Sequence, residues 1–181
     1  LITRITEAHI ENFVDINGII AAKAEICYGL SPDSTLILNK NDNNYKKLQQ
    51  HILAKYNLDK KNIKTFGNNN LNDLIIKELA YKEHKLYALI TINNQDYKLN
   101  FSLFNKGVAE ILCSILLVTT ELNLDPLKAC KKISEITASE GRGKITEIKF
   151  NEKKITLIND SYNANFDSMK AADRKSTRLN S

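Results

Sequence analysis

The chain has 181 residues, of which 43% are hydrophobic and 26% are charged. This composition is typical of one globular domain with a real core and excludes a disordered or membrane-embedded chain. The longest apolar stretch, residues 111–118, is too short to cross a bilayer, and the first residues do not resemble a secretory signal. We therefore expect no membrane partner.

The formal net charge of +5 raises the question of nucleic-acid binding. The lysines are scattered among acidic residues, without a basic stripe interleaved with aromatic side chains, so we expect no nucleic-acid partner. Three cysteines, Cys27, Cys113 and Cys130, lie far apart on apolar segments without the spacing of metal ligands. This pattern favours buried thiols in a reducing compartment and therefore a cytoplasmic protein.

Residues 173–181 differ in character from the rest of the chain. Their sequence, D-R-K-S-T-R-L-N-S, matches the translation of a common sequencing-library adapter at all nine positions. The segment carries three basic residues and one acidic residue, so residues 1–172 have a net charge of +3. We expect 173–181 to be a non-native tail, the alternative being an ordinary polar terminus.

The first half of the chain predicts alternating strands and helices. A strand end at 1–5 is followed by a helix at 17–28, a strand at 34–38, an amphipathic helix at 43–56 and a strand at 63–66. Alternation of this kind predicts the α/β class, with a mostly parallel sheet and flanking helices.

The second half begins differently. Residues 74–101 predict a small antiparallel insert, with a turn at Asn93-Asn94 and alternation of apolar and polar residues near its end. Two helices are predicted at 108–122 and 126–136, the second capped by Asp125 with Pro126 in its first turn. Strands are predicted at 145–150 and 154–158, and a loop and helix at 160–172.

His9 and Lys23 are the first candidate site residues. Taken alone, the histidine is more often structural than a ligand, and a lysine between alanines on a helix is usually a solvated charge. Their context, A-H-I-E-N-F followed by A-A-K-A-E-I, resembles the A-H-L-x-x-F and A-x-K-x-E-I pattern of the Mur ligase family. The resemblance implies that His9 binds Mg²⁺ and that Lys23 is carbamylated, since a carbamate supplies the oxygen ligands that Mg²⁺ prefers.

A second motif, N-D-S-Y-N-A-N-F-D-S-M, occupies residues 159–169. Taken alone it could be a polar turn that caps a helix. It resembles D-D-S-Y-N-A-N-P-D-S-M of the Mur ligases that add D-alanyl-D-alanine. Upstream, Glu140-Gly141-Arg142 resembles the E-G-R loop of the family, where an arginine suits phosphate because its guanidinium donates two parallel hydrogen bonds. The nucleotide-binding residues that the resemblance implies are Arg142, Asp160, Tyr162, Asn163 and Asn165.

The resemblance extends over residues 2–172 and implies part of a Mur ligase central, ATP-binding domain. The implied reaction is ATP-dependent: the carboxylate of UDP-N-acetylmuramoyl-tripeptide becomes an acyl phosphate, which the amine of D-alanyl-D-alanine attacks. ATP and Mg²⁺ are the implied cofactors, and the enzyme is expected to be a monomer. The phosphate loop of the family, G-x-x-G-K-[ST], does not occur in the sequence. We therefore expect an incomplete sheet and an inactive fragment.

Four departures from the family pattern stand out. Lys106, Gly107 and Glu110 occupy positions where a histidine and two asparagines help to hold adenine in the family. Arg4, Asn159 and Phe166 replace an asparagine, an aspartate and a proline. Two alternative functions stay open: another ATP-dependent amide ligase, of the Mur or the folylpolyglutamate type, which would share His9 and Lys23, and a basic RNA-binding module.

Overall fold

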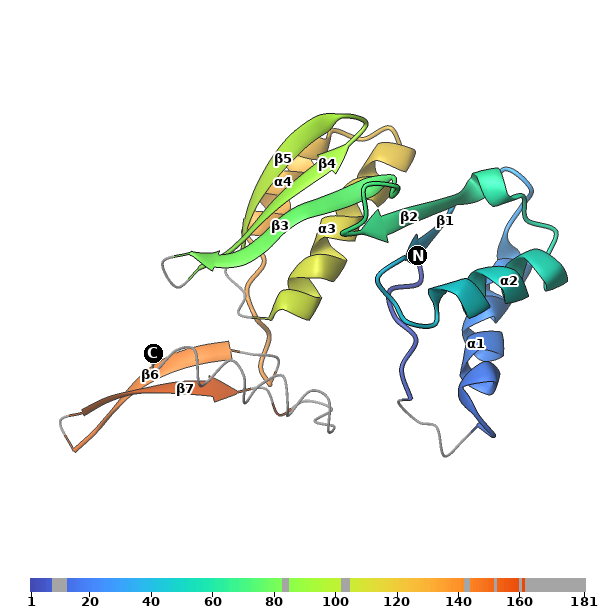
Figure 1. The fold of residues 1–181 in the computed structure, drawn as a ribbon. Helices are drawn as coiled ribbons and strands as arrows, with labels where there is room; N and C mark the ends of the chain where they lie inside the picture. Colours follow the sequence, from blue (N-terminus) through green and yellow to red (C-terminus); the bar gives the residue numbers. More distant parts are fainter. Residues whose placement is uncertain are drawn as a thin grey trace.

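The structure is a computed structural model. It describes residues 1–7, 13–82, 85–101, 105–141, 144–151, 153–159 and 161. Figure 1 shows a five-stranded sheet with helices packed against it and a separate two-stranded hairpin near the carboxyl end of the described chain.

The main sheet has the order β1-β2-β3-β4-β5. Its strands are β1 (Leu36–Asn39), β2 (Ile63–Gly67), β3 (Leu74–Lys82), β4 (Lys85–Ile92) and β5 (Gln95–Phe101). The pairs β1–β2 and β2–β3 are parallel, and the pairs β3–β4 and β4–β5 are antiparallel. Consequently only β4 runs against the other four strands, and the predicted mostly parallel α/β sheet is confirmed. The predicted antiparallel insert, residues 74–101, supplies three of the five strands of this sheet, β3, β4 and β5.

Helices cover both faces of the sheet, as the side chains of β1 show. Leu36 and Leu38 belong to a buried cluster with α1 (Ile16–Ala24) and α2 (Tyr45–Lys55), whereas Ile37 belongs to a second cluster with α3 (Lys106–Glu121). Successive residues of a strand point to opposite faces, so α1 and α2 lie on one face and α3 on the other. The helix α4 (Pro126–Ser134) packs beside α3, and its Ile133 is buried in the same cluster.

The helix ends follow the predicted capping chemistry. The carboxylate of Asp125 accepts hydrogen bonds from the backbone N–H groups of Leu127 and Lys128, and Pro126 occupies the first turn of α4. Asn105 caps α3 in the same way. Such caps satisfy backbone donors that have no partner within the helix. The predicted helix at 17–28 is split instead, because a 3₁₀ helix, η2 (Glu25–Gly29), follows α1.

The remaining strands, β6 (Lys144–Phe150) and β7 (Lys153–Asn159), form a hairpin that does not join the main sheet. A second 3₁₀ helix, η3 (Lys60–Asn62), precedes β2. None of the described helices is long and apolar enough to cross a membrane. Cys27 and Cys113 are buried and Cys130 is partly buried, and all three are free thiols as predicted.

Candidate functional site

The carboxyl ends of β1 and β2 lie next to each other and carry a group of asparagines. β1 ends at Asn39, which is buried and donates through Nδ2 to the backbone carbonyl of Thr3 at 3.0 Å. Its Oδ1 accepts a hydrogen bond of 2.9 Å from the backbone N–H of Asn41. The side chain of Asn39 therefore fixes the loop after β1 against the first residues of the chain.

Asn41 connects three segments that are far apart in the sequence. Its Nδ2 donates to Oε1 of Glu110 on α3 at 2.6 Å and to Oδ1 of Asn68 at 3.3 Å. Its Oδ1 accepts a hydrogen bond of 3.0 Å from the backbone N–H of Asn68, directly after β2. One amide thus holds the ends of β1 and β2 against the first turns of α3, which Figure 1 shows beside the tip of β2.

Gly67, the last residue of β2, is required for this arrangement. Its φ angle of 154° lies in a region that favours glycine. A Cβ atom at this position would lie 2.5 Å from Oδ1 of Asn41 and 3.1 Å from Nδ2 of Asn72. Gly67 therefore allows the loops after β1 and β2 to approach each other.

A polar cleft of about 740 Å³ opens at this edge of the sheet. It is lined by Arg4, Asn41, Asn68, Ile76, Lys77, Leu79, Lys106, Gly107 and Glu110. The cleft is therefore formed by the carboxyl ends of parallel strands and the amino end of α3, the place where open α/β sheets commonly bind ligands. A second cleft of about 340 Å³ shares Arg4 and Asn41 with it and extends along the loop 41–44.

The charges of the larger cleft favour an anionic ligand. Three of its side chains are cationic, Arg4, Lys77 and Lys106, and one is a carboxylate, Glu110. Lys77 forms an ion pair of 2.8 Å with Asp96, and the ammonium of Lys106 lies 5.3 Å from the ring centroid of Tyr81. An excess of positive charge in a concave site attracts polyanions such as nucleotide phosphates. Both N–H groups of the Asn41 amide already donate to Glu110 and Asn68, so the polar group that suits a heterocyclic base is the side-chain amide of Asn68.

Of the predicted site residues, only Lys23 lies within the described part of the chain. It occupies the last turn of α1, its side chain is exposed, and it lines neither cleft. A cation in the last turn of a helix also interacts favourably with the helix dipole, which is the structural interpretation of this residue. The other predicted site residues lie outside the described residues: His9, Arg142, Asp160, Tyr162, Asn163 and Asn165.

Two residues of the second motif, Asn159 and Ser161, lie within the described part of the chain. Asn159 ends β7 and donates through Nδ2 to Oε1 of Glu140 at 3.2 Å, while Lys144 donates to Oε2 of Glu140 at 2.8 Å. The hydrogen bond and the charge of Lys144 lower the pKa of the Glu140 carboxyl. Ser161 donates to Oδ1 of Asn159 at 2.8 Å. Glu140, from the E-G-R segment, is therefore in contact with the first residue of the second motif.

Of the polar residues that line the cleft, sequence reasoning missed Asn41, Asn68 and Lys77. It treated Arg4, Lys106 and Glu110 only as departures from a family pattern. The available signal was the position of both asparagines directly after predicted strands, where polar residues line the ligand edge of a parallel sheet. In the described residues no group of three or more His, Cys, Asp or Glu side chains has the geometry of a metal site.

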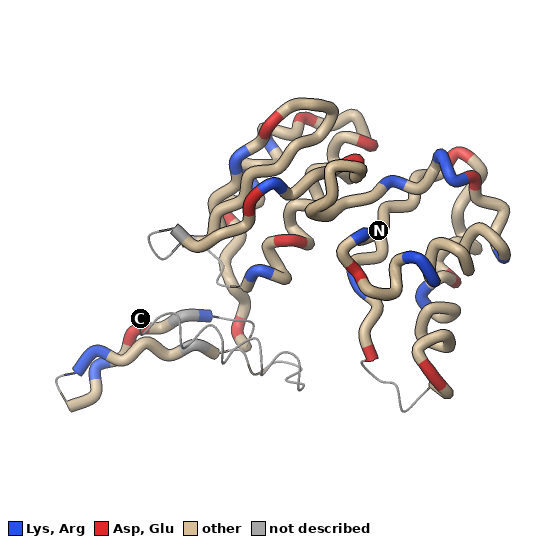
Figure 2. The backbone as a smooth tube through the Cα atoms, in the orientation of Figure 1, with Lys and Arg blue, Asp and Glu red and all other residues tan. Residues whose placement is uncertain are grey.

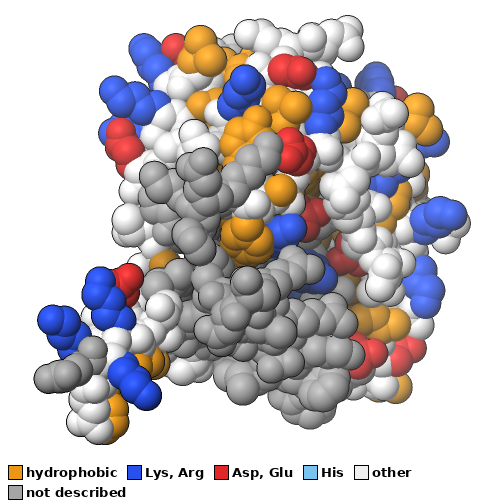
Figure 3. Space-filling view, turned by 60° about the vertical axis from the view of Figure 1, so that its left-hand side comes forward, with side chains coloured by type: hydrophobic (Ala, Val, Ile, Leu, Met, Phe, Trp, Pro, Cys, Tyr) orange, Lys and Arg blue, Asp and Glu red, His pale blue; other side chains and the backbone are white. Residues whose placement is uncertain are grey.

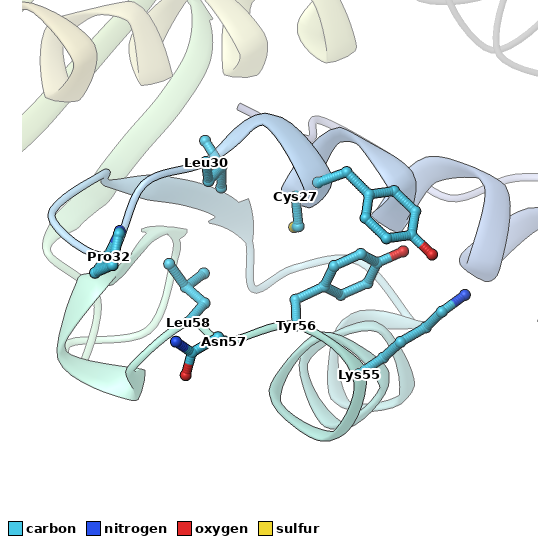
Figure 4. Close-up of a pocket in the computed structure, with 8 residues that line it drawn as sticks. Cys27, Leu30, Pro32, Lys55, Tyr56, Asn57 and Leu58 are labelled. Carbon is cyan, nitrogen blue, oxygen red and sulfur yellow. The ribbon is translucent and has the colours of Figure 1, made fainter.

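A further pocket lies away from this edge, between η2 and the end of α2 (Figure 4). It has a volume of about 250 Å³ and includes Cys27, Tyr28, Lys55 and Tyr56 in its lining. The rings of Tyr28 and Tyr56 meet edge to face with centroids 4.9 Å apart, and the ammonium of Lys55 lies 5.7 Å from each centroid. The cation that interacts with these two aromatic rings is therefore supplied by Lys55 of the protein itself.

Comparison with known proteins identifies the family of the chain. Residues 1–117 match the model of the Mur ligase middle domain. The chain is 32% identical over 175 residues to the UDP-N-acetylmuramoyl-tripeptide--D-alanyl-D-alanine ligase of Rickettsia prowazekii. The matched region covers 95% of this chain but only 37% of that ligase.

Solved structures share the fold. MurF from Acinetobacter baumannii superimposes with a TM-score of 0.79 at 19% identity, over 96% of this chain and 36% of that one. MurF ligase from Thermotoga maritima in complex with ADP gives a TM-score of 0.69 at 18% identity, over 96% of this chain and 38% of that one. This chain thus spans little more than a third of the length of these relatives. From the family model and the identity to the Rickettsia enzyme, it follows that the chain belongs to the Mur ligase family.

Proposed function

We propose that this chain is the nucleotide-binding part of a longer ATP-dependent ligase that adds D-alanyl-D-alanine to UDP-N-acetylmuramoyl-tripeptide. The activity belongs to the parent protein, because the chain spans 37% of the relative that is named for this reaction. The observation that carries the proposal is the cationic cleft at the carboxyl ends of β1 and β2, formed within a chain that carries the motif of residues 159–169.

The cleft suits the phosphates and base of ATP. Arg4 and Lys106 bring positive charge to it, and the side-chain amide of Asn68 brings hydrogen-bonding groups. For Mg²⁺ we propose His9 and the carbamate of Lys23 as ligands, with Arg142, Asp160, Tyr162, Asn163 and Asn165 near the nucleotide. The exposed position of Lys23 on α1 leaves its amine accessible to CO₂, and a carbamate is an oxygen donor, which Mg²⁺ prefers. Bound Mg²⁺ would neutralise phosphate charge during transfer.

The role of the protein in such a reaction is mainly positioning. The hydrogen bonds of Asn41 hold the strand ends and α3 in one arrangement, so that cationic side chains face the same space before a ligand arrives. Groups fixed in advance need not reorganise as charge develops on a transferring phosphoryl group. We further propose that the parent is a cytoplasmic monomer and that residues 173–181 are not native to it.

The proposal is tested with the parent protein, cloned from the genomic sequence that surrounds residues 1–172. Phosphate release should require ATP, UDP-N-acetylmuramoyl-tripeptide and D-alanyl-D-alanine together, and mass spectrometry should show the pentapeptide product. Release that requires a folate and glutamate instead would replace the proposal with a folylpolyglutamate-type activity. If neither set of substrates gives turnover, both the proposed activity and the folylpolyglutamate-type activity are contradicted.

A further inference from the structure

The hairpin β6–β7 carries an apolar face that the described part of the chain leaves open. Its strands pair with Ile148 opposite Ile155 and Thr146 opposite Leu157, and directly opposed residues of a hairpin share a face. Phe150 lies two residues beyond Ile148 and therefore on the same side. We call Ile148, Phe150, Ile155 and Leu157 the hairpin face.

All four side chains are exposed, with relative accessibilities between 41% and 63%. No described helix or strand outside the hairpin packs extensively against β6 or β7. Figure 3 shows lysines beside apolar side chains where the molecule projects at lower left. An isolated two-stranded hairpin is at best marginally stable in water, so this face needs a partner.

The base of the hairpin is held in place, although its face is not covered. Glu140 accepts hydrogen bonds from Lys144 at the start of β6 and from Asn159 at the end of β7. These contacts join the two strands to the loop before them. The end of the hairpin nearest the rest of the chain is therefore fixed to Glu140, while the hairpin face remains exposed.

The charges of the hairpin argue against a second copy of this chain as the partner. The described residues of β6 and β7 include four lysines at positions 144, 149, 153 and 154, and one acid, Glu147. Figure 2 shows lysines gathered toward the tip of the hairpin. Lys144 and Lys153 lie on the side of the hairpin face, whereas Lys149 and Lys154 lie on the opposite side. Lys144 is already paired with Glu140, so two hairpins packed face to face would bring the Lys153 side chains together, which disfavours association.

The length of the relatives points to a different partner. They extend well beyond the part that this chain matches, since it covers only 37% of the Rickettsia ligase. We propose that the hairpin face docks against an apolar, neutral or acidic surface formed by residues of the parent polypeptide outside the shared residues 1–172. This inference rests on the proposal that the chain is part of a longer ligase.

The test compares Ile155→Glu with Thr156→Glu in the parent protein and in the chain of residues 1–181. Both positions are exposed in the structure, and Thr156 lies on the opposite side of β7 from the hairpin face. In the parent, Ile155→Glu should lower Tm by several degrees and Thr156→Glu should leave it nearly unchanged, because only the first would place a charge in a buried contact. In residues 1–181 neither variant should lower Tm appreciably.

Amide hydrogen exchange supplies a second measurement that does not depend on any variant. Exchange in residues 146–150 and 153–157 should be slower in the parent than in residues 1–181 by roughly a hundredfold. Equal exchange in both proteins, or equal Tm for both parent variants, would overturn the proposal. A dimer in sedimentation velocity that Ile155→Glu dissociates would assign the face to a second copy instead. Neither measurement uses turnover. A failure of the docking proposal can therefore be told apart from a failure of the proposed reaction.

Discussion

Single residues at the cleft show how closely the local backbone depends on its neighbours. Gly67→Ala should destabilise residues 1–181 by about 2 kcal/mol, because the new Cβ would meet Asn41 and the backbone angle disfavours a side chain. Gly29→Ala is the matched control, since a Cβ there meets no atom within 4 Å. Urea denaturation of both variants measures the difference. Equal stability of the two variants would mean that the loops after β1 and β2 do not meet as described.

Tyr56 is a second position where a single atom, the hydroxyl oxygen, affects the free energy of unfolding. Its ring is buried, and among the described residues no group meets the geometry of a hydrogen bond to its buried hydroxyl. Tyr56→Phe should therefore leave the free energy of unfolding within about 1 kcal/mol of the original, or raise it slightly, because an unsatisfied polar group is removed. Tyr56→Ala should cost about 3 kcal/mol through the lost ring packing. A marked loss of stability in Tyr56→Phe would show that the hydroxyl has a partner.

Substitution of Lys23 tests whether this residue has a catalytic role or only stabilises its helix. In the parent, Lys23→Ala should reduce turnover by several orders of magnitude if its carbamate orients Mg²⁺. Added acetate should restore part of the loss by supplying a carboxylate, and His9→Ala combined with Lys23→Ala should lose much less than the two single losses combined. Turnover is measured with and without acetate. Near-normal turnover of Lys23→Ala would leave only the structural interpretation, an exposed cation in the last turn of α1.

At the scale of elements, capping makes the stability of α1 depend on pH. The carboxylate of Asp15 accepts hydrogen bonds from the backbone N–H groups of Gly18 and Asn17 and from the side chain of Asn17, and these bonds lower its pKa from the ordinary value of 3.8. A lowered pKa means that the carboxylate stabilises the folded state above pH 3.8. This contribution is lost as the pH falls through the folded-state value.

Asp15→Ala should therefore be less stable than the original chain near neutral pH, and the difference should shrink below pH 3.8. Thermal unfolding of both proteins across the acid range measures it. Asp15→Asn is the control, because its amide oxygen can cap the helix but does not titrate. A difference in stability between the Ala variant and the original that stays constant with pH would show that Asp15 is not a charged cap.

The elements themselves were largely predictable, whereas their contacts were not. Period-two alternation placed Tyr97, Leu99 and Phe101 in a strand, and all three are buried. Asp125 and Pro126 fixed the start of α4 through local chemistry. The change to a 3₁₀ helix after Ala24 was missed, because the composition of residues 17–28 suits either helix type. Local sequence determines such elements, but tertiary packing decides where they end.

The cleft depended on information that no local pattern contains. Asn41 meets Asn68 and Glu110, which lie 27 and 69 residues away in the sequence. Periodicity predicts that strands end near these residues, but it does not say which strands become neighbours. Only the parallel pairing of β1 with β2 brings the asparagines together. The family motifs, by contrast, were identified from residue order alone, and those residues fall mostly outside the described part of the chain.

At the scale of the whole molecule, the cleft has the positive charge that phosphate binding needs, but the described residues do not supply the backbone N–H donors that usually accompany it. Phosphates are bound most strongly where several backbone N–H groups point at them, as in a glycine-rich loop before a helix. The sequence contains no G-x-x-G-K-[ST] segment. At the start of α3, the N–H groups of Gly107 and Val108 already donate to Asn105. The cleft therefore offers cationic side chains without a described set of free backbone donors.

Residues 1–172 should consequently bind ATP only weakly, with a dissociation constant in the millimolar range, and should show no ligase activity. The parent protein should bind ATP far more tightly, because its phosphate loop would add the missing backbone donors to the charge of Arg4 and Lys106. Isothermal calorimetry on both proteins, at one fixed salt and Mg²⁺ concentration, measures the difference. Micromolar affinity in residues 1–172 would mean that the cleft at the ends of β1 and β2 is sufficient for nucleotide binding by itself.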